Sequence, residues 1–311
     1  MSPDDAETET VMEKRALGGT GLEVSVIGFG AMTIGGAFGP VDDDESNRAL
    51  HAAIDAGMNF IDTSDAYGAG RSENVIGGFL KERSDRDDIL VFTKGGNNMG
   101  TGKTDFTPDY IAIALEASLQ RLGVTPALYM LHNPKVENLT AEDSYALLEE
   151  AKEDGKIANW GVSVNTVAEC DVAVSQGKPS VIQMEYNILT QGAADSFARA
   201  RAAGVGVIAR MPLKRGFLSG SIDETHEFAE GDRRKEMFSP ENIRKLQGKL
   251  DDLRDEADKL SLSPAAAAIR FCVSNPNVSC VLPGIRTSDQ SRENASFGRS
   301  LPVEVVQRLQ D

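Results

Sequence analysis

Short apolar runs and longer amphipathic runs alternate along the chain. The short runs have the length and apolar content of buried strands, and they cover residues 59–62, 89–94, 128–132, 158–163, 181–184, 205–211 and 278–283, with one further run around 23–28. Between them, hydrophobic residues recur at helical spacing over 45–56, 72–81, 108–122, 141–154, 168–176, 191–203 and 264–273. Thr107 before Pro108 and Ser263 before Pro264 are typical helix starts.

This order of elements predicts an α/β fold with a closed parallel sheet, the (β/α)8 TIM barrel. Strands this short and apolar are buried on both faces, as the strands of such barrels are. An open doubly wound sheet is the alternative, and it usually carries a Gly-x-Gly-x-x-Gly turn between its first strand and helix. The one candidate starts at Gly28, has Thr33 in place of the third glycine and is not followed by a helix. The barrel is therefore the favoured prediction.

Three additions to the barrel are predicted. Residues 11–24, with Gly18 and Gly19 near the centre, indicate a β-hairpin that closes the barrel bottom. Residues 217–240 form a long polar loop after the seventh strand, where barrels place lids. Residues 241–260 have the spacing of a charged amphipathic helix. We expect residues 1–10 to be a disordered lead and 11–311 to form a single domain, since there is no linker or repeat.

The composition limits the classes of partner. The formal charge of −16 argues against binding to nucleic acid or to an anionic membrane, and any phosphate site must be built from local cations. No apolar stretch approaches the roughly 20 residues that span a bilayer, and the acidic N-terminus does not resemble a signal peptide. Cys170, Cys272 and Cys280 fit neither a disulfide framework nor metal-ligand spacing. We therefore expect buried thiols, no metal and a cytoplasmic location, and the oligomeric state stays open.

Polar residues stand at the ends of several predicted strands, which form the working face of a parallel barrel. An acid, a base and one of only three histidines end strands two, three and four, as Asp62, Lys94 and His132. The polar loop after Asp62 would bring Tyr67 back over the mouth. Each residue alone is more often a surface group or a salt-bridge partner, but their joint placement favours a site. Further strand-end residues are Ser163, Gln183 and Arg210.

Together these residues make a proton-transfer cluster. A neutral tyrosine is a poor acid near pH 7, and a neighbouring buried ammonium improves it by stabilising the phenolate. Asp62 would keep Lys94 charged despite burial. His132 would donate a hydrogen bond to a substrate carbonyl and orient it.

Motifs in the same order and spacing resemble those of the aldo-keto reductase superfamily, from about residue 15 to residue 294. They are Leu17-Gly18-Gly19-Thr20-Gly21-Leu22, Ile27-Gly28-Phe29-Gly30, the run 59–68 (Asn-Phe-Ile-Asp-Thr-Ser-Asp-Ala-Tyr-Gly), Thr93-Lys94-Gly95, Met130-Leu131-His132-Asn133-Pro134, Trp160-Gly161-Val162-Ser163, the run 212–220 (Pro-Leu-Lys-Arg-Gly-Phe-Leu-Ser-Gly) and Leu282-Pro283-Gly284-Ile285-Arg286.

The resemblance implies a (β/α)8 barrel that uses NADPH without a Rossmann domain and reduces small-molecule aldehydes or ketones. It implies a catalytic tetrad of Asp62, Tyr67, Lys94 and His132, with Tyr67 as the proton donor. Cofactor contacts would come from the ends of strands five to eight and the segments that follow them: Ser163, Asn165, Gln183, Arg210, Pro212, Leu213, Lys214, Arg215, Gly216, Gly220, Gly284, Arg286, Gln290, Glu293 and Asn294.

The chain departs from the family pattern near the predicted nicotinamide site. Many members have an asparagine directly after the serine of strand five, whereas here Val164 intervenes and the amide falls at Asn165. Many also place a stacking aromatic residue at the end of strand seven, where this chain has Arg210. Because the lysine-serine-arginine set of some branches is absent after strand eight, the preference for NADPH depends on Arg286 alone.

Two other functions remain open. The potassium-channel β subunits of this superfamily keep the barrel and the cofactor but use them as a sensor. One alternative is therefore that this protein is a regulatory subunit with little turnover. A barrel isomerase or aldolase with Lys94 as Schiff-base nucleophile is the other, but it leaves Arg286 without a role. We expect substrate specificity to come from the mouth loops 33–40, 95–103, 133–138 and 217–240, with Phe38 and Asn97 lining the entrance.

Overall fold

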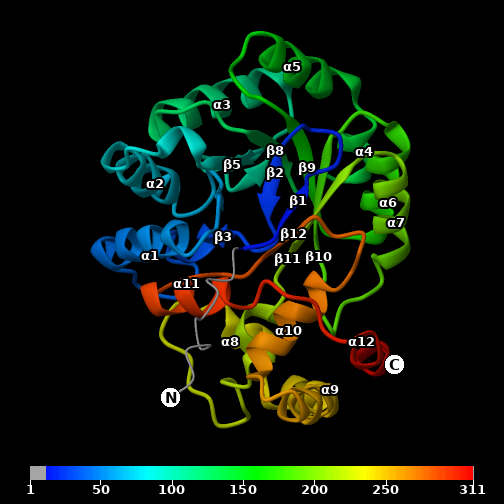
Figure 1. Ribbon diagram of the computed structural model, residues 1–311. Helices are drawn as coiled ribbons and strands as arrows, with labels where there is room; N and C mark the ends of the chain where they lie inside the picture. Colours follow the sequence, from blue (N-terminus) through cyan, green and yellow to red (C-terminus); the bar gives the residue numbers. More distant parts are fainter. Residues whose placement is uncertain (1–11, 311) are drawn as a thin grey trace, which may run out of the picture.

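The computed structural model describes residues 12–310, so the predicted disordered lead, 1–10, lies outside the described residues. Eight parallel strands follow one another around a barrel, each hydrogen-bonded to its neighbours (Figure 1). Bridges between Ile27 and Val281 and between Gly30 and Gly284 join the last strand to the first. The predicted (β/α)8 barrel is confirmed, with the strands β3 (Phe29–Gly30), β4 (Phe60–Asp62), β5 (Leu90–Gly95), β8 (Leu128–His132), β9 (Trp160–Val164), β10 (Val181–Glu185), β11 (Gly206–Arg210) and β12 (Cys280–Leu282).

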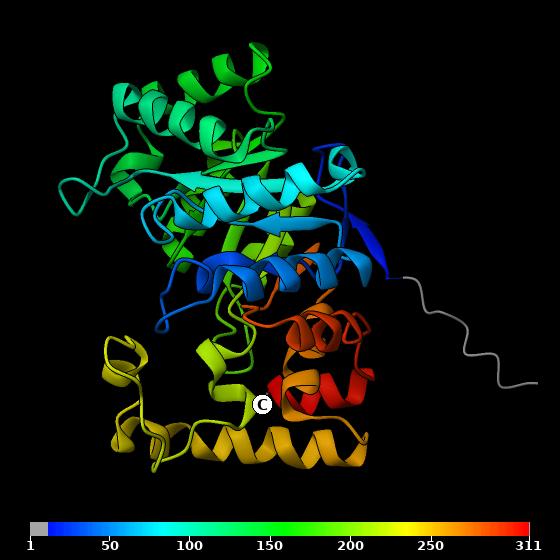
Figure 2. The ribbon, with the colours of Figure 1, turned by 90° about the vertical axis from the view of Figure 1, so that its left-hand side faces the viewer.

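Helices surround the strands on the outside (Figure 1). Those that connect or follow the barrel strands are α1 (Asp43–Asp55), α2 (Arg71–Glu82), α3 (Pro108–Leu122), α5 (Glu142–Glu153), α6 (Val167–Gln176), α7 (Ala194–Ala202), α10 (Pro264–Val273) and α11 (Ser288–Ala295). The shorter or additional ones are α4 (Val136–Leu139), α8 (Arg234–Met237), α9 (Pro240–Lys259), α12 (Val303–Gln310) and the 3-10 turns η1 (Ala31–Thr33), η2 (Arg86–Asp88) and η3 (Lys214–Ser219). In Figure 2, α9 runs along the outer edge of the molecule beyond α10.

Local sequence explains where these helices begin and end. The Ser263 hydroxyl accepts a hydrogen bond from the amide of Ala266 at the start of α10, as a serine N-cap does. Thr166 and Glu169 form a reciprocal capping box at the start of α6. Gly123 ends α3 in the left-handed conformation, with φ of 68°, which a residue with a Cβ rarely adopts.

Alternation along each strand divides the side chains between two cores. Phe60, Phe92, Leu128 and Ile208 point into the barrel, where they pack with one another. Their strand neighbours, such as Ile61 on β4, pack outward against the helices. Because every second residue faces inward, the inward positions nearest the carboxyl ends include the polar strand-end residues predicted to form the site, such as Asp62 after Phe60 and Lys94 after Phe92.

The N-terminal hairpin pairs β1 (Lys14–Ala16) with β2 (Glu23–Ser25) and crosses one end of the barrel (Figure 1). Its Leu17 is fully buried among the inward-facing apolar residues at the strand starts. The amide of Gly19 donates to the carbonyl of Gly204 just before β11, at 2.7 Å. A Cβ on Gly18 would lie 2.2 Å from the amide nitrogen of Gly206, so only glycine permits this approach.

The structure corrects several details. Residues 23–28 do not form a barrel strand, because Glu23–Ser25 pairs with the hairpin and the barrel pairing begins at Ile27. Within the predicted loop 217–240, η3 and α8 are helical. The mouth loop 95–103 contains a second hairpin, β6 (Asn97–Asn98) with β7 (Lys103–Thr104).

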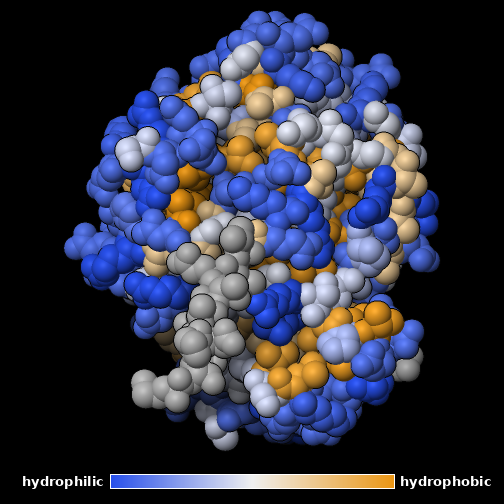
Figure 3. Space-filling view, viewed as in Figure 1, coloured by the Kyte–Doolittle hydropathy of each residue, from blue (hydrophilic) through white to orange (hydrophobic). Residues whose placement is uncertain are grey.

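The molecular surface is predominantly polar on the side shown. The face shown in Figure 3 is mostly hydrophilic, with apolar residues visible in gaps between the outer elements. Across residues 12–310, no helix combines the length and apolar character needed to cross a membrane.

Candidate active site

The carboxyl ends of the barrel strands bring the predicted tetrad together. Asp62 ends β4, Lys94 lies near the end of β5 and His132 ends β8. The strands pair directly in the order β4, β5, β8, so these residues come from three adjacent strands. Tyr67 lies in the turn after β4, with its ring centroid 5.8 Å from that of His132.

Lys94 and Asp62 form a buried ion pair at the centre of the site. The ammonium Nζ donates to Asp62 Oδ1 at 2.5 Å and to the carbonyl of Thr63 at 2.9 Å. The Lys94 side chain has no exposed surface and that of Asp62 has 5%. Burial alone would lower the pKa of Lys94, but Asp62 and Tyr67 raise it above the usual lysine value. The lysine is therefore held as a cation inside the barrel.

The Tyr67 hydroxyl reaches this cation. Lys94 Nζ donates to Tyr67 Oη at 3.5 Å, and the ammonium lies 5.2 Å from the centre of the tyrosine ring. A turn directs the side chain inward, with the Tyr67 amide donating to the carbonyl of Ser64. The loop that contains Gly35 lies very close to this turn. A Cβ on Gly35 would come within 2.5 Å of the Tyr67 backbone.

His132 is held by a residue that sequence reasoning did not single out. Its Nδ1 lies 2.9 Å from the hydroxyl oxygen of Ser64, which follows β4. Burial, together with the charges of Lys94 and Arg210, lowers the pKa of His132 well below its usual value. The imidazole is therefore neutral at physiological pH, and the Ser64 bond leaves Nε2 for another partner.

Gln183 joins the tetrad. Its Nε2 donates to Asp62 Oδ2 at 2.7 Å, and its Oε1 accepts from the Ser163 hydroxyl at 3.3 Å. Both carboxylate oxygens of Asp62 are therefore occupied, one by Lys94 and one by Gln183. The predicted contact of Ser163 and Gln183 with a nicotinamide carboxamide stays a prediction.

Arg210 and Asn165, the residues at which the chain departs from the family pattern, contact each other. Arg210 Nη2 donates to Asn165 Oδ1 at 2.7 Å and to the carbonyl of Val164 at 3.1 Å. The buried Nε of Arg210 has no hydrogen-bond partner. Buried donors without a partner are uncommon in folded proteins, which marks this guanidinium as a candidate for a ligand contact.

The segment after β11 has an unusual run of left-handed backbone. Pro212 and Leu213 lead into η3, and Lys214, Arg215, Gly216 and Gly220 all have positive φ. Lys214 Nζ donates hydrogen bonds to Glu185 Oε1 at 2.5 Å and to the Thr190 hydroxyl at 3.1 Å. Glu185, at the end of β10, was not anticipated. Glu185 thus offsets the charge of Lys214, whereas the buried Nε of Arg215 has no hydrogen-bond partner.

The cofactor contacts predicted after strand eight follow β12. Arg286 donates through Nη1 to the carbonyl of Phe38 at 3.2 Å and also hydrogen-bonds the carbonyl of Pro40. Its backbone amide donates to Gln290 Oε1 at 2.8 Å. Gly284 is exposed at the strand end, whereas Glu293 and the buried Asn294 lie on α11. Arg286 thus ties the segment after β12 to the loop 33–40 and to Gln290.

Two mouth loops are joined across this region. The guanidinium of Arg234, on α8, lies 4.7 Å from the ring centre of Phe38 and 5.7 Å from that of Phe228. Arg234 is also paired with Asp232 at 2.7 Å. The loop 217–240 therefore contacts the loop 33–40 in the position predicted for a lid.

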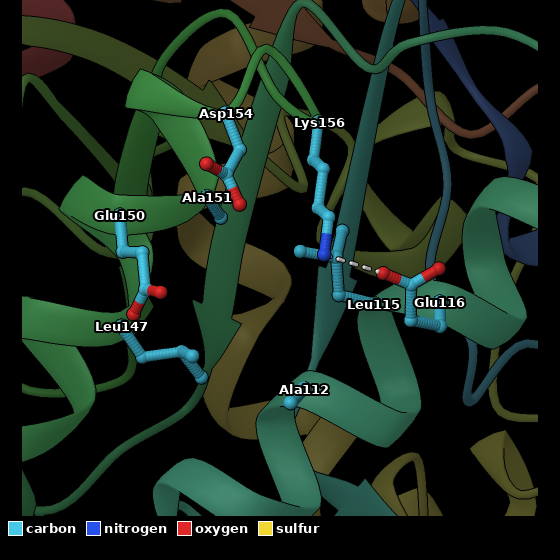
Figure 4. Close-up of a pocket in the computed structure, with 8 residues that line it drawn as sticks. All are labelled: Ala112, Leu115, Glu116, Leu147, Glu150, Ala151, Asp154 and Lys156. Carbon is cyan, nitrogen blue, oxygen red and sulfur yellow. Dashed lines mark ion pairs between the residues drawn. The ribbon is translucent and has the colours of Figure 1, made fainter.

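A pocket on the outside of the barrel is separate from this site (Figure 4). It lies between α3 and α5, and Lys156 forms an ion pair with Glu116 across it at 2.8 Å. None of the tetrad residues lines this pocket, which is formed by Ala112, Leu115, Glu116, Leu147, Glu150, Ala151, Asp154 and Lys156.

Comparisons with known proteins agree with the fold. Residues 26–311 match the Aldo/keto reductase family. The chain is 27% identical over 310 residues to the uncharacterized oxidoreductase YqkF of Bacillus subtilis (strain 168), covering 96% of both chains. It is 29% identical over 282 residues to the aldo-keto reductase yakc [NADP(+)] of Schizosaccharomyces pombe, covering 87% of this chain and 83% of the relative.

Solved structures show the same similarity. The glycerol dehydrogenase AKR11B4 from Gluconobacter oxydans has a TM-score of 0.83 at 30% identity, over 96% of this chain and 94% of that one. The aldo-keto reductase AKR11C1 from Bacillus halodurans, in its holo form, has a TM-score of 0.81 at 28% identity, over 96% and 95%. The fold and its polar mouth are those of a (β/α)8-barrel enzyme. The chain belongs to the aldo/keto reductase family of oxidoreductases.

Proposed function

We propose that this protein reduces small-molecule aldehydes or ketones with NADPH, and oxidises the corresponding alcohols in reverse. The observation that carries the proposal is the buried ammonium of Lys94, which contacts both Asp62 and the Tyr67 hydroxyl at the barrel mouth. A lysine held charged in this way serves as an electrostatic partner for a proton donor. It is unsuited to Schiff-base chemistry, which needs the neutral amine.

Each member of the tetrad has a distinct task in the proposed reaction. Tyr67 donates its phenolic proton to the carbonyl oxygen as the carbonyl is reduced. Lys94 stabilises the phenolate that remains, and Asp62 holds Lys94 in place with its charge retained. His132, which is neutral, presents Nε2 to the carbonyl oxygen and orients it. When bound, NADPH supplies the hydride that completes the reduction.

The residues present fit a nicotinamide dinucleotide phosphate. Arg210, at the end of β11, and Arg215, shortly after it, each have a buried Nε donor with no protein acceptor. The left-handed backbone from Lys214 to Gly216 turns the chain as anion-binding loops do. Arg286 would bind the 2′-phosphate, and Ser163, Asn165 and Gln183 would hold the carboxamide. The name of the yakc relative, which specifies NADP(+), supports this choice.

A cofactor-oxidation assay tests the proposal. Purified protein is mixed with NADPH and a panel of reactive aldehydes and ketones, and the absorbance of the reduced cofactor is followed. We expect turnover with at least one of them, and the name of the AKR11B4 neighbour suggests glyceraldehyde as a member of the panel. Tight NADPH binding without turnover of any carbonyl would contradict the proposal and favour a cofactor-sensing subunit.

Arg286→Ala is expected to weaken NADPH binding without weakening NADH binding. A charge-assisted hydrogen bond contributes about 1.5–3 kcal/mol, which predicts a loss of roughly ten- to a hundredfold in NADPH affinity. Fluorescence titration with both cofactors measures the effect. Arg292→Ala, which removes the same charge from an exposed position on α11, is the control and should leave both affinities unchanged. An equal loss for NADPH and NADH would assign Arg286 a structural role only.

Arg210→Tyr is expected to strengthen NADP⁺ binding relative to NADPH. The guanidinium of Arg210 lies near the predicted nicotinamide position, and the oxidised ring carries a positive charge that the reduced ring lacks. Removing one like charge about 4 Å away in a water-like dielectric is worth about 1 kcal/mol, or roughly fivefold in the affinity ratio. Titration of both cofactors gives this ratio directly. An unchanged ratio would show that Arg210 does not discriminate between the two redox states.

A further inference from the structure

A buried carboxyl group lies directly behind the proposed tetrad and has no role in the chemistry described so far. Asp65 is 7% exposed and follows the strand that carries Asp62. Its Oδ1 lies 3.1 Å from the hydroxyl oxygen of Ser64. The same hydroxyl oxygen lies 2.9 Å from His132 Nδ1. Ser64 thus connects Asp65 to the imidazole.

The Ser64 hydroxyl also lies 3.3 Å from the carbonyl of Lys94, and two arrangements of its proton use the shorter contacts to Asp65 and His132. It has one proton to donate and two lone pairs, one of which accepts from the amide of Ala66 at 3.1 Å. If Ser64 donates to an ionised Asp65, its free lone pair accepts from His132 Nδ1–H, and Nε2 carries no proton. If Asp65 is protonated and donates to Ser64, the serine donates to Nδ1, and the imidazole proton is on Nε2.

We propose that Asp65 is a positioning residue that selects the tautomer of His132 through the Ser64 hydroxyl. Ionised Asp65 stabilises the tautomer with the proton on Nδ1, and protonated Asp65 stabilises the tautomer with the proton on Nε2. Because His132 itself stays neutral, the switch changes which nitrogen carries the proton and leaves the ring uncharged.

The surroundings of Asp65 allow it to change its protonation near neutral pH. Burial and the carboxylate of Glu73, on α2, raise the pKa of Asp65 to about 7. Arg121, on α3, opposes this rise but is itself paired with Glu73 at 2.6 Å. Tyr110, from α3, and the fully buried Tyr129, from β8, also interact electrostatically with Asp65. On the His132 side, the charged neighbours are Lys94 and Arg210.

The tautomer has a direct consequence for catalysis, and this step rests on the proposed function. A carbonyl substrate needs a donor at His132 Nε2, which the protonated form of Asp65 provides. The reverse reaction needs the same donor, because the alcohol gives its proton to the Tyr67 phenolate while its oxygen still accepts from Nε2. Asp65 thus supports the reaction through this contact when it is protonated, below its pKa.

Nitrogen NMR of the histidine rings tests the inference without any turnover. The chain has only three histidines, and His51→Gln and His226→Gln variants identify the signals of His132 by subtraction. In the unaltered protein, we expect the protonated nitrogen of His132 to change from Nε2 to Nδ1 between pH 5.5 and pH 8.5, spanning the pKa of Asp65 at about 7. In Asp65→Asn, one tautomer should persist at every pH.

Two further variants sharpen the result. Ser64→Ala keeps the titrating carboxyl group but removes the connection, so the tautomer should again be independent of pH. Asp105→Asn removes an exposed carboxylate that hydrogen-bonds Thr107, and it should behave as the unaltered protein does. A single tautomer of His132 from pH 5.5 to 8.5 in the unaltered protein would overturn the inference, as would an undiminished tautomer change in Asp65→Asn.

Kinetics provide a second measurement. For carbonyl reduction, kcat/KM should fall as the pH rises through the pKa of Asp65, and this decline should be absent in Asp65→Asn. Ser64→Ala should lower kcat/KM at pH 6 by about tenfold, the value of one lost hydrogen bond. A merely structural role would lower the rate equally at every pH and leave the shape of the profile unchanged, which would count against the inference.

Discussion

Tyr67→Phe is expected to lower kcat for carbonyl reduction by about a thousandfold, within the range that a positioned proton donor contributes. The substitution removes only the hydroxyl that contacts Lys94, and the ring keeps its place beside His132. NADPH affinity and the melting temperature should therefore change little. Steady-state kinetics with the best aldehyde from the panel, together with a cofactor titration, measure both properties.

Tyr145→Phe is the matched control for this substitution. Its hydroxyl is buried and has no hydrogen-bond partner, and its ring packs against Trp160 in the outer layer of the molecule. It should retain full activity. If Tyr67→Phe kept more than a tenth of the activity, another group would have to supply the proton.

Lys94→Met should both inactivate and destabilise the protein. Removing one member of a buried ion pair leaves the carboxylate of Asp62 uncompensated, which costs about 3–5 kcal/mol of unfolding free energy. Gln183 alone would remain as a side-chain donor to that carboxylate. Denaturant unfolding measures the loss of stability, and the NADPH assay measures the loss of activity.

The double variant Asp62→Asn/Lys94→Met separates the two effects. With both charges removed, most of the lost stability should return, because neutral groups cost less to bury. Activity should stay absent, since the tyrosine has lost its cationic partner. If Lys94→Met were as stable as the unaltered protein, or if the double variant were no more stable than Lys94→Met, the buried pair would not have the energetic role described.

Much of the barrel could be predicted because each strand carries its own pattern. Along a strand, the residues that face into the barrel are apolar first and become polar at its carboxyl end. Phe60 is followed by Asp62 on β4, and Phe92 by Lys94 on β5. The helices α11 and α12 were not predicted. The segment of α11 is too polar to show an apolar face, and its docking depends on a contact distant in sequence, from the Ser291 hydroxyl to the carbonyl of Ala49 at 2.7 Å.

The predicted site was incomplete for a similar reason. The tetrad residues were recognisable because of their residue types at strand ends and their resemblance to a family pattern. The partners of those residues come from pairings that no local pattern encodes, such as Gln183 with Asp62, which are 121 residues apart. The ion pair of Lys214 with Glu185 is a second example. Lys214 lies in the segment predicted to bind the cofactor, but a carboxylate from the neighbouring strand β10 offsets its charge. Ser64 and Asp65 lay inside a recognised motif, but only the structure shows that they connect to His132.

Isotope transfer tests the central claim most directly. The protein is incubated with an aldehyde and NADPH that carries deuterium at the transferable position of C4, and the product alcohol is analysed by mass spectrometry and NMR. Direct reduction at the barrel mouth predicts one deuterium on the carbinol carbon, with the hydroxyl proton coming from solvent through Tyr67. Oxidation of the bound NADPH with no deuterium on the product carbon, or no oxidation of bound NADPH by any carbonyl compound, would contradict the account.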